Sequence, residues 1–181
     1  METSENTRLI KALNRMLAKE HACAIRYATH AVLVNGPYAE SVCRRFQEIA
    51  SDETVHAELL RRRICALGGT PTMEVDGGPR CTDGTLAEMI KTNVLEERES
   101  IETYSAILEN IPGMNILLHR TVEGILKDEQ EHLEELLRLE PLKEETPSTE
   151  TLDVPLEDRE LEDRSPSRTA GCFGIEPMNG E

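Results

Sequence analysis

The stretch Lys127–Leu136, "KDEQEHLEEL", places an acid and an imidazole three residues apart in the middle of a long helical pattern. Residues at this spacing share one face of a helix, so Glu129 and His132 point the same way. Val122, Ile125 and Leu136 fall on that face as well, which marks it as the buried one. The sequence therefore predicts a carboxylate and an imidazole inside an apolar core, where neither is stable without a partner.

Outward from this stretch, heptad-like apolar spacing divides residues 1–140 into four long segments bounded by helix breakers. The segments run from about Asn6 to Val34, from Pro37 to Gly68-Gly69, from Asp83–Thr85 to Pro112-Gly113, and from Met114 to Leu139. No alternating strand pattern appears, so the predicted fold class is all-α. Short turns join the segments into two antiparallel hairpins, and the roughly 17 residues between the hairpins are long enough to cross the length of a four-helix bundle.

Each of the four apolar stripes is interrupted near its centre by Glu or by Glu and His. The interrupting residues are Glu20, Glu53, His56, Glu97, Glu129 and His132. Antiparallel packing brings them to one level of the bundle, where four uncompensated carboxylates would be very costly. Two divalent metal ions would balance the four negative charges, and mixed carboxylate and imidazole ligands suit iron or manganese, with zinc also allowed.

An internal repeat supports this metal-site hypothesis. Glu20 and Tyr27 are echoed by Glu97 and Tyr104, and "DETVH" (52–56) is echoed by "DEQEH" (128–132). The two hairpins are thus predicted to be related halves that meet at the metals. Asp52 and Asp128 are expected to accept hydrogen bonds from the imidazoles of the opposite hairpin. Both tyrosines are expected to be core aromatics with one hydrogen bond, whereas His21, His30 and His119 are interpreted as surface residues.

Composition excludes several other classes of protein. The net charge of −15 disfavours nucleic-acid binding, and no apolar run is long enough to cross a membrane. Five widely spaced cysteines without a CxxC pair argue against a disulfide framework or a zinc site of cysteines. A cytoplasmic location is expected. Residues 1–140 are predicted to form the bundle domain, and 141–181, rich in Pro, Ser, Thr and acids, to form a disordered acidic tail.

Four segments of the chain resemble the ferritin-like superfamily, and bacterioferritin in particular: "LNRMLAKEHACAIRY", "DETVHAELLRRRICALGGTPT", "LEERESIETY" and "LKDEQEHLEELLRLE". The resemblance covers residues 5–140. It implies a ferroxidase centre of two iron ions, with Glu20 and Glu97 as terminal ligands, Glu53 and Glu129 as bridging ligands, and His56 and His132 each completing one iron. The implied activity is oxidation of Fe(II) by dioxygen or peroxide for iron storage or detoxification.

The sequence also departs from the bacterioferritin pattern. Thr54 stands where that family has a haem-ligating Met, so haem is not expected, and no short fifth helix is evident after Pro141. A homo-oligomer is expected, either a cage or something smaller. "LDVPL" (152–156) faintly resembles the docking peptides of proteins enclosed in encapsulin shells.

Two other functions stay open at this point. One is a di-iron oxygenase or peroxidase that acts on a small organic substrate, and the other is a helical interaction protein with a structural metal. The sequence leaves open the size of the assembly, the oxidant, and the choice between iron and manganese.

Overall fold

The structure, a computed structural model, describes residues 2–77 and 84–139 of the chain. Three predictions fall on residues outside the described ranges: the disordered tail, its "LDVPL" peptide and the lack of a fifth helix. Cys81 and Cys172 also lie outside these ranges. Among the described cysteines, Cys23 and Cys43 are buried and Cys65 is exposed.

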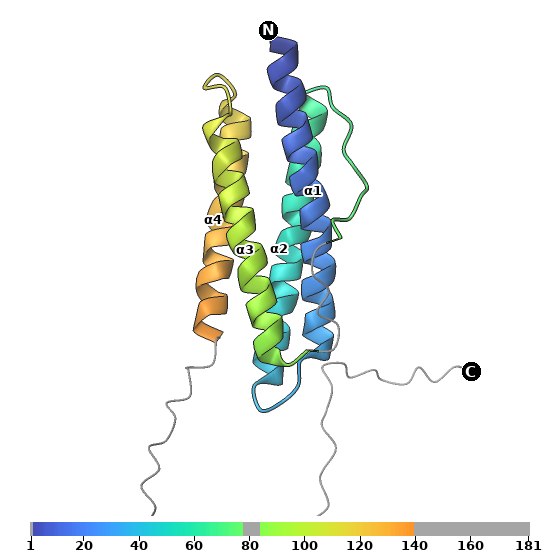
Figure 1. Ribbon diagram of the computed structural model, residues 1–181, viewed down its shortest axis with the longest axis vertical. Helices are drawn as coiled ribbons and strands as arrows, with labels where there is room; N and C mark the ends of the chain where they lie inside the picture. Colours follow the sequence, from blue (N-terminus) through green and yellow to red (C-terminus); the bar gives the residue numbers. More distant parts are fainter. Residues whose placement is uncertain (1, 78–83, 140–181) are drawn as a thin grey trace, which may run out of the picture. The chain divides into compact units, whose positions relative to one another are not determined.

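The described part of the chain contains four helices and no strand, which confirms the all-α prediction. They are α1 (Glu2–Leu33), α2 (Ala39–Ala66), α3 (Leu86–Glu109) and α4 (Ile116–Leu139). Helices α1 and α2 form one antiparallel hairpin, and α3 and α4 form the other (Figure 1). The hairpins meet because α1 packs on α3 and α2 packs on α4. The fold is therefore the predicted four-helix bundle with a long crossover.

Local sequence explains where the helices begin and end. Thr85 caps α3 through a capping box, because its hydroxyl accepts from the Glu88 amide and the Glu88 carboxylate accepts from the Thr85 amide. Helix α2 ends before Gly68, whose φ of 78° lies in the left-handed region that glycine adopts without strain. Helix α1 begins earlier than predicted, at Glu2, because no Pro or Gly interrupts the segment before Asn6.

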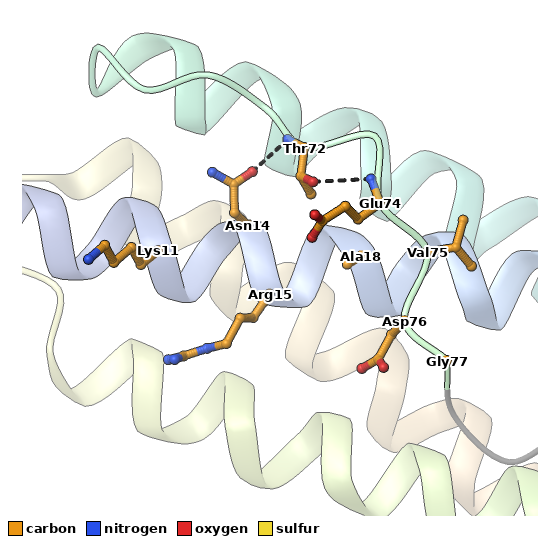
Figure 2. Close-up of a pocket in the computed structure, with 9 residues that line it drawn as sticks. All are labelled: Lys11, Asn14, Arg15, Ala18, Thr72, Glu74, Val75, Asp76 and Gly77. Carbon is orange, nitrogen blue, oxygen red and sulfur yellow. Dashed lines mark hydrogen bonds between the residues drawn. The ribbon is translucent and has the colours of Figure 1, made fainter.

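The described part of the crossover, residues 67–77, is fastened along the outer face of α1. The Thr72 amide donates to Asn14 Oδ1 at 2.7 Å, as Figure 2 shows, and the Asp76 amide donates to the Ala18 carbonyl at 2.9 Å. Gly69 approaches α1 so closely that a Cβ there would lie 2.7 Å from a methyl group of Ile10. These contacts direct the crossover from the end of α2 back along the bundle toward the start of α3.

The core consists of two apolar clusters, one on each side of the middle of the bundle. One contains Leu13, Leu60 and Leu118, and the other contains Phe46, Ile90 and Leu136. The first joins the start of α1 to the α3–α4 turn, and the second joins the α1–α2 turn to the start of α3. The level between them is occupied by polar side chains. No described helix has a stretch long and apolar enough to span a bilayer.

Candidate metal centre

The polar level at the middle of the bundle holds the six residues that interrupt the apolar stripes. Helices α1 and α3 contribute one Glu each, and α2 and α4 contribute a Glu and a His each. None of the six is more than 2 % exposed: Glu20, Glu53, His56, Glu97, Glu129 and His132. We call these six residues the central cluster.

The central cluster divides into two overlapping sets of potential metal ligands. One set consists of Glu20, His56, Glu53 and Glu129, and the other consists of Glu97, His132, Glu53 and Glu129. Within each set, one ligand atom from every residue lies within 4.8 Å of the others. Glu53 and Glu129 belong to both sets, so the geometry offers two adjacent cation positions that share two carboxylates.

Several polar atoms of the central cluster are buried without a hydrogen-bond partner. They are Glu20 Oε2, Glu53 Oε1, Glu97 Oε2, Glu129 Oε1 and His132 Nδ1. Buried polar atoms are nearly always paired in folded proteins, so a group of orphaned atoms at one place needs a physical reason. All of them are atoms that bind metal ions, and the donor set is the carboxylate and imidazole mixture that iron and manganese accept. The residues present therefore fit a pair of such ions.

Asp52 and Asp128 orient the two imidazoles, as the repeat predicted. His132 Nε2 lies 3.3 Å from Asp52 Oδ2, and His56 Nε2 lies 3.4 Å from Asp128 Oδ2. Each contact joins α2 to α4 and therefore joins the two hairpins. A proton on Nε2, donated to the aspartate, leaves the Nδ1 lone pair directed at the carboxylates, which is the tautomer a metal ligand needs. His56 Nδ1 lies 3.3 Å from both Glu53 Oε2 and Glu129 Oε1.

Two buried tyrosines orient the carboxylates of α1 and α3 in the same reciprocal way. Tyr27 on α1 donates its hydroxyl to Glu97 Oε1 on α3, and Tyr104 on α3 donates to Glu20 Oε1 on α1. Both tyrosines are fully buried, which confirms the prediction of core aromatics with one hydrogen bond each. Each tyrosine occupies one oxygen of its glutamate and leaves the other, Oε2, without a hydrogen-bond partner.

The electrostatics of the central cluster without metal favour bound protons. Burial, reinforced by the neighbouring Glu53 carboxylate, raises the pKa of Glu20 and Glu129 well above the usual value, and burial also raises the pKa of Glu97. Burial would raise the pKa of Glu53 too, but the imidazoles of His132 and His56, whose Nδ1 atoms lie 3.4 Å and 3.3 Å from its two carboxylate oxygens, lower it instead. Metal binding at this place must therefore displace protons.

His30 corrects one expectation from the sequence. It was predicted to lie on the surface, but it is 1 % exposed, and its Nδ1 lies 3.2 Å from Asn93 Nδ2. The remaining two histidines differ from it: His119 is exposed, and His21 is partly buried, with its ring nitrogens against the Glu74 carbonyl and Arg61.

His30 ends a buried polar row between α1 and α3. Arg26 donates from Nε to Asn93 Oδ1 at 3.2 Å and lies 3.6 Å from Glu96 Oε2, and Lys19 Nζ lies 3.7 Å from the same oxygen. We call these five residues, Lys19, Arg26, His30, Asn93 and Glu96, the α1–α3 seam. Spacing along α1 could have indicated it, since Lys19, Arg26 and His30 follow steps of seven and four residues.

One pocket reaches the central cluster from outside. It has a volume of about 380 Å³, lies between α1 and α2 beneath the crossover, and is lined by Glu20, Ala24, Thr54 and Met73, among others. Glu20 is the residue of the central cluster that borders this pocket.

Comparisons with known proteins agree with this geometry. Residues 10–144 match the Ferritin family, described as a ferritin-like domain. The chain is 33 % identical over 129 residues to the bacterioferritin of Desulfovibrio desulfuricans, an alignment that covers 70 % of each protein. A crystal structure of that bacterioferritin, which describes its diiron site in different catalytic states, has a TM-score of 0.71 at 26 % identity, covering 77 % of this chain and 82 % of that one.

Two further solved structures are similar. A ferritin-like diiron-carboxylate protein from Bacillus anthracis has a TM-score of 0.71 at 33 % identity and covers 76 % of this chain and 98 % of its own. A dodecameric thioferritin from Bacteroides fragilis has a TM-score of 0.67 at 27 % identity, with coverage of 74 % and 84 %. The chain belongs to the ferritin-like family and is related to the bacterioferritins.

Proposed function

We propose that the central cluster binds two iron ions and that the protein is a ferroxidase, which oxidises Fe(II) for iron storage or detoxification. One observation carries the proposal: two overlapping, fully buried ligand sets share Glu53 and Glu129, and their metal-binding atoms lack hydrogen-bond partners. The kinship with proteins described as diiron or diiron-carboxylate proteins supports the choice of iron.

The roles of the six residues follow from the two ligand sets. Glu20 and His56 would complete one iron position, Glu97 and His132 would complete the other, and Glu53 and Glu129 would bridge both. Two Fe(II) ions carry four positive charges against four carboxylates, so the loaded centre is neutral when both imidazoles are neutral. Asp52 and Asp128 accept the Nε2 proton of each ring, which fixes the tautomer whose Nδ1 can bind a metal ion.

In the proposed reaction, the two electrons lost by the iron ions equal the two electrons gained by the oxidant, so no residue outside the central cluster has to be oxidised or reduced. Each of the two Fe(II) ions loses one electron, and both electrons pass to the oxidant. Dioxygen and two protons then give hydrogen peroxide, or hydrogen peroxide and two protons give two waters. Tyr27 and Tyr104 hold the carboxylates of α3 and α1 in place while the charge on the metals changes.

Aerobic addition of Fe(II) tests the proposal. A ferroxidase that stores iron takes up many irons per chain with growing ferric absorbance, an oxygenase stops near two, and a structural metal site shows no turnover. Glu129→Ala should abolish rapid oxidation and keep the helical content. Glu131→Ala is the matched control, because Glu131 lies on the same helix but is exposed and pairs with Lys127. Unchanged oxidation in Glu129→Ala would contradict the site assignment.

We also propose that the protein acts as a homo-oligomer. The support is the similarity to assembled relatives, among them the dodecameric thioferritin. Native mass together with metal content measures the size of the assembly and the number of irons for each chain.

A further inference from the structure

The α1–α3 seam lies one residue away from two ligands of the central cluster. Lys19 precedes Glu20 on α1, and Glu96 precedes Glu97 on α3. Successive residues of an α-helix point about 100° apart around the helix axis, because one turn takes 3.6 residues. A contact that fixes the direction of Lys19 or Glu96 therefore also fixes the direction of the glutamate that follows it.

One carboxylate of the α1–α3 seam joins the two helices through several contacts. Glu96 Oε2 lies 3.7 Å from Lys19 Nζ and 3.6 Å from Arg26 Nη1. Arg26 also donates from Nε to Asn93 Oδ1 at 3.2 Å. The contacts extend over about two turns of α1 and about one turn of α3. They therefore oppose both the sliding of α1 along α3 and the rotation of either helix about its own axis.

Stability alone does not explain why these ion pairs are buried. The side chains of Lys19, Arg26 and Glu96 are only 8 %, 8 % and 9 % exposed. Removing charges from water costs free energy, and apolar side chains of similar volume often stabilise a core at least as well as an ion pair does. Ion pairs and hydrogen bonds, however, need one defined arrangement of their partners. The α1–α3 seam therefore specifies how the two helices lie against each other.

The internal repeat places Lys19 and Glu96 at equivalent positions, because each precedes the first ligand glutamate of its hairpin. Like charges at these two positions would repel, but the chain has a base in one hairpin and an acid in the other. Asp52 and Asp128 are also equivalent, and each contacts the imidazole of the opposite hairpin. The residue before every ligand glutamate thus makes a contact between the two hairpins.

We propose that the α1–α3 seam positions ligands: it fixes the rotation of α1 and α3 so that Glu20 and Glu97 face the two cation positions. This inference rests on the proposed function, because it assumes that the central cluster binds metal ions. Glu20 belongs to one ligand set and Glu97 to the other, so the seam affects both positions. The shared ligands Glu53 and Glu129 lie on α2 and α4. Damage to the seam therefore weakens the binding of both ions without changing their number.

Anaerobic Co(II) titrations of two seam variants test the proposal. Glu96→Gln keeps the size of the side chain but removes its charge, so the affinity for both ions should fall up to about 100-fold. Lys19→Met removes one ion pair and leaves Arg26 beside Glu96, so the affinity should fall about tenfold. Both variants should still bind two Co(II) per chain. The absorbance spectrum of the bound Co(II) should change, because it depends on the geometry of the ligands.

Two controls separate positioning from a general loss of stability. Leu118→Ala truncates a core side chain that is 1 % exposed, so it should lower the melting temperature but keep the original Co(II) affinity and spectrum. Glu99→Ala removes an acid that lies 3.0 Å from Lys19 Nζ but is 69 % exposed, so it should also keep the affinity and the spectrum.

The possible results distinguish this inference from the proposed function. Original affinity and an unchanged Co(II) spectrum in both seam variants would overturn the positioning role. Equally weak binding in Leu118→Ala would overturn it too, because the effect would then follow stability. Two bound Co(II) without oxidation of added Fe(II) would count against the ferroxidase and, together with weaker binding in the seam variants, would still support the positioning role. No Co(II) binding by the original protein would overturn both.

Discussion

The central cluster and the α1–α3 seam are both buried, polar and charged, yet they differ in how their atoms are paired. In the seam, Arg26 reaches Asn93 and Glu96, Lys19 reaches Glu96, and Asn93 reaches His30. In the central cluster, five carboxylate and imidazole atoms have no hydrogen-bond partner, whereas in the seam only Lys19 Nζ has none, and it forms an ion pair with the exposed Glu99 at 3.0 Å. Buried polar side chains that bind one another contribute to the structure. Several buried polar atoms at one place without partners indicate a missing ligand.

Metal addition should give the largest difference between the central cluster and the α1–α3 seam. Anaerobic Fe(II) or Co(II) should stabilise the folded protein by about 5 kcal/mol, from two sites at free metal ~100 times the Kd. The metal should occupy the central cluster and should leave the α1–α3 seam unchanged. Thermal unfolding with and without metal measures the effect, and Glu53→Ala, which removes a carboxylate shared by both ligand sets, serves as the control. Equal shifts in the original protein and in Glu53→Ala would contradict the assignment.

Removing the acid of the α1–α3 seam should have the next largest effect. Glu96→Ala leaves Lys19 and Arg26 buried without their shared carboxylate, so it should lower the free energy of unfolding by about 3–5 kcal/mol. Metal stoichiometry per folded chain should stay the same. The matched variant is Glu99→Ala, whose carboxylate touches the same lysine but is 69 % exposed, with an expected loss of about 0–1 kcal/mol. Denaturant unfolding measures both, and equal losses would show that burial is not the cause.

The pH dependence of stability should reveal the protons on the central cluster. The pKa values of Glu20, Glu97, Glu129 and both histidines are raised in the fold, so their contribution is complete below the unfolded pKa values and is lost as pH rises. The pKa of Glu53 is lowered, and its contribution is lost only below about pH 4.5.

Metal-free protein should therefore lose stability between about pH 5 and 8, by at most about 1.4 kcal/mol per pH unit for each proton retained in the folded state. The metal-induced increase in melting temperature should grow over the same range, because protons no longer compete with the metal. Melting curves at several pH values check this. In Glu129→Gln, which removes one of the raised carboxylates, the metal-free slope should be shallower. A metal-free protein that gains stability as pH rises would contradict the protonated cluster.

Loss of one tyrosine hydroxyl should give the smallest effect. Tyr104→Phe removes the donor to Glu20 Oε1, so metal affinity should fall about tenfold, while the free energy of unfolding falls by about 1 kcal/mol. A Co(II) titration followed by absorbance measures the affinity. The control is Tyr38→Phe, at a tyrosine 75 % exposed in the α1–α2 turn. If Tyr104→Phe bound metal as tightly as the control, the hydroxyl would have no part in holding Glu20.

The central cluster could be predicted from the sequence because its signal is local and repeated. The spacing of Glu129 and His132 on one helical face recurs at Glu53 and His56, and the apolar residues on both sides identify that face as buried. The acceptors Asp52 and Asp128 followed from the same repeat, since each lies one residue before its glutamate, and the structure confirms both contacts.

The α1–α3 seam could not be found in this way. Lys19, Arg26 and His30 are polar, and single-helix periodicity assigns polar residues to solvent unless an apolar neighbour contradicts it. Their burial depends on Asn93 and Glu96 of another helix, and pairing between helices is not visible in the period of either one. The early start of α1 at Glu2 was missed for a simpler reason, because a helix end without a breaker leaves no mark in the sequence.

The reciprocal support of the ligands has a consequence for the history and engineering of this chain. Tyr27 and Asp52 of the first hairpin hold Glu97 and His132 of the second, and Tyr104 and Asp128 return the same contacts to Glu20 and His56. One hairpin alone can neither gather nor orient the ligands, but two copies of one hairpin could supply the whole set. A split protein, expressed as two separate fragments, should therefore recover metal binding when the fragments are combined, because each hairpin then supplies the groups that orient the ligands of the other.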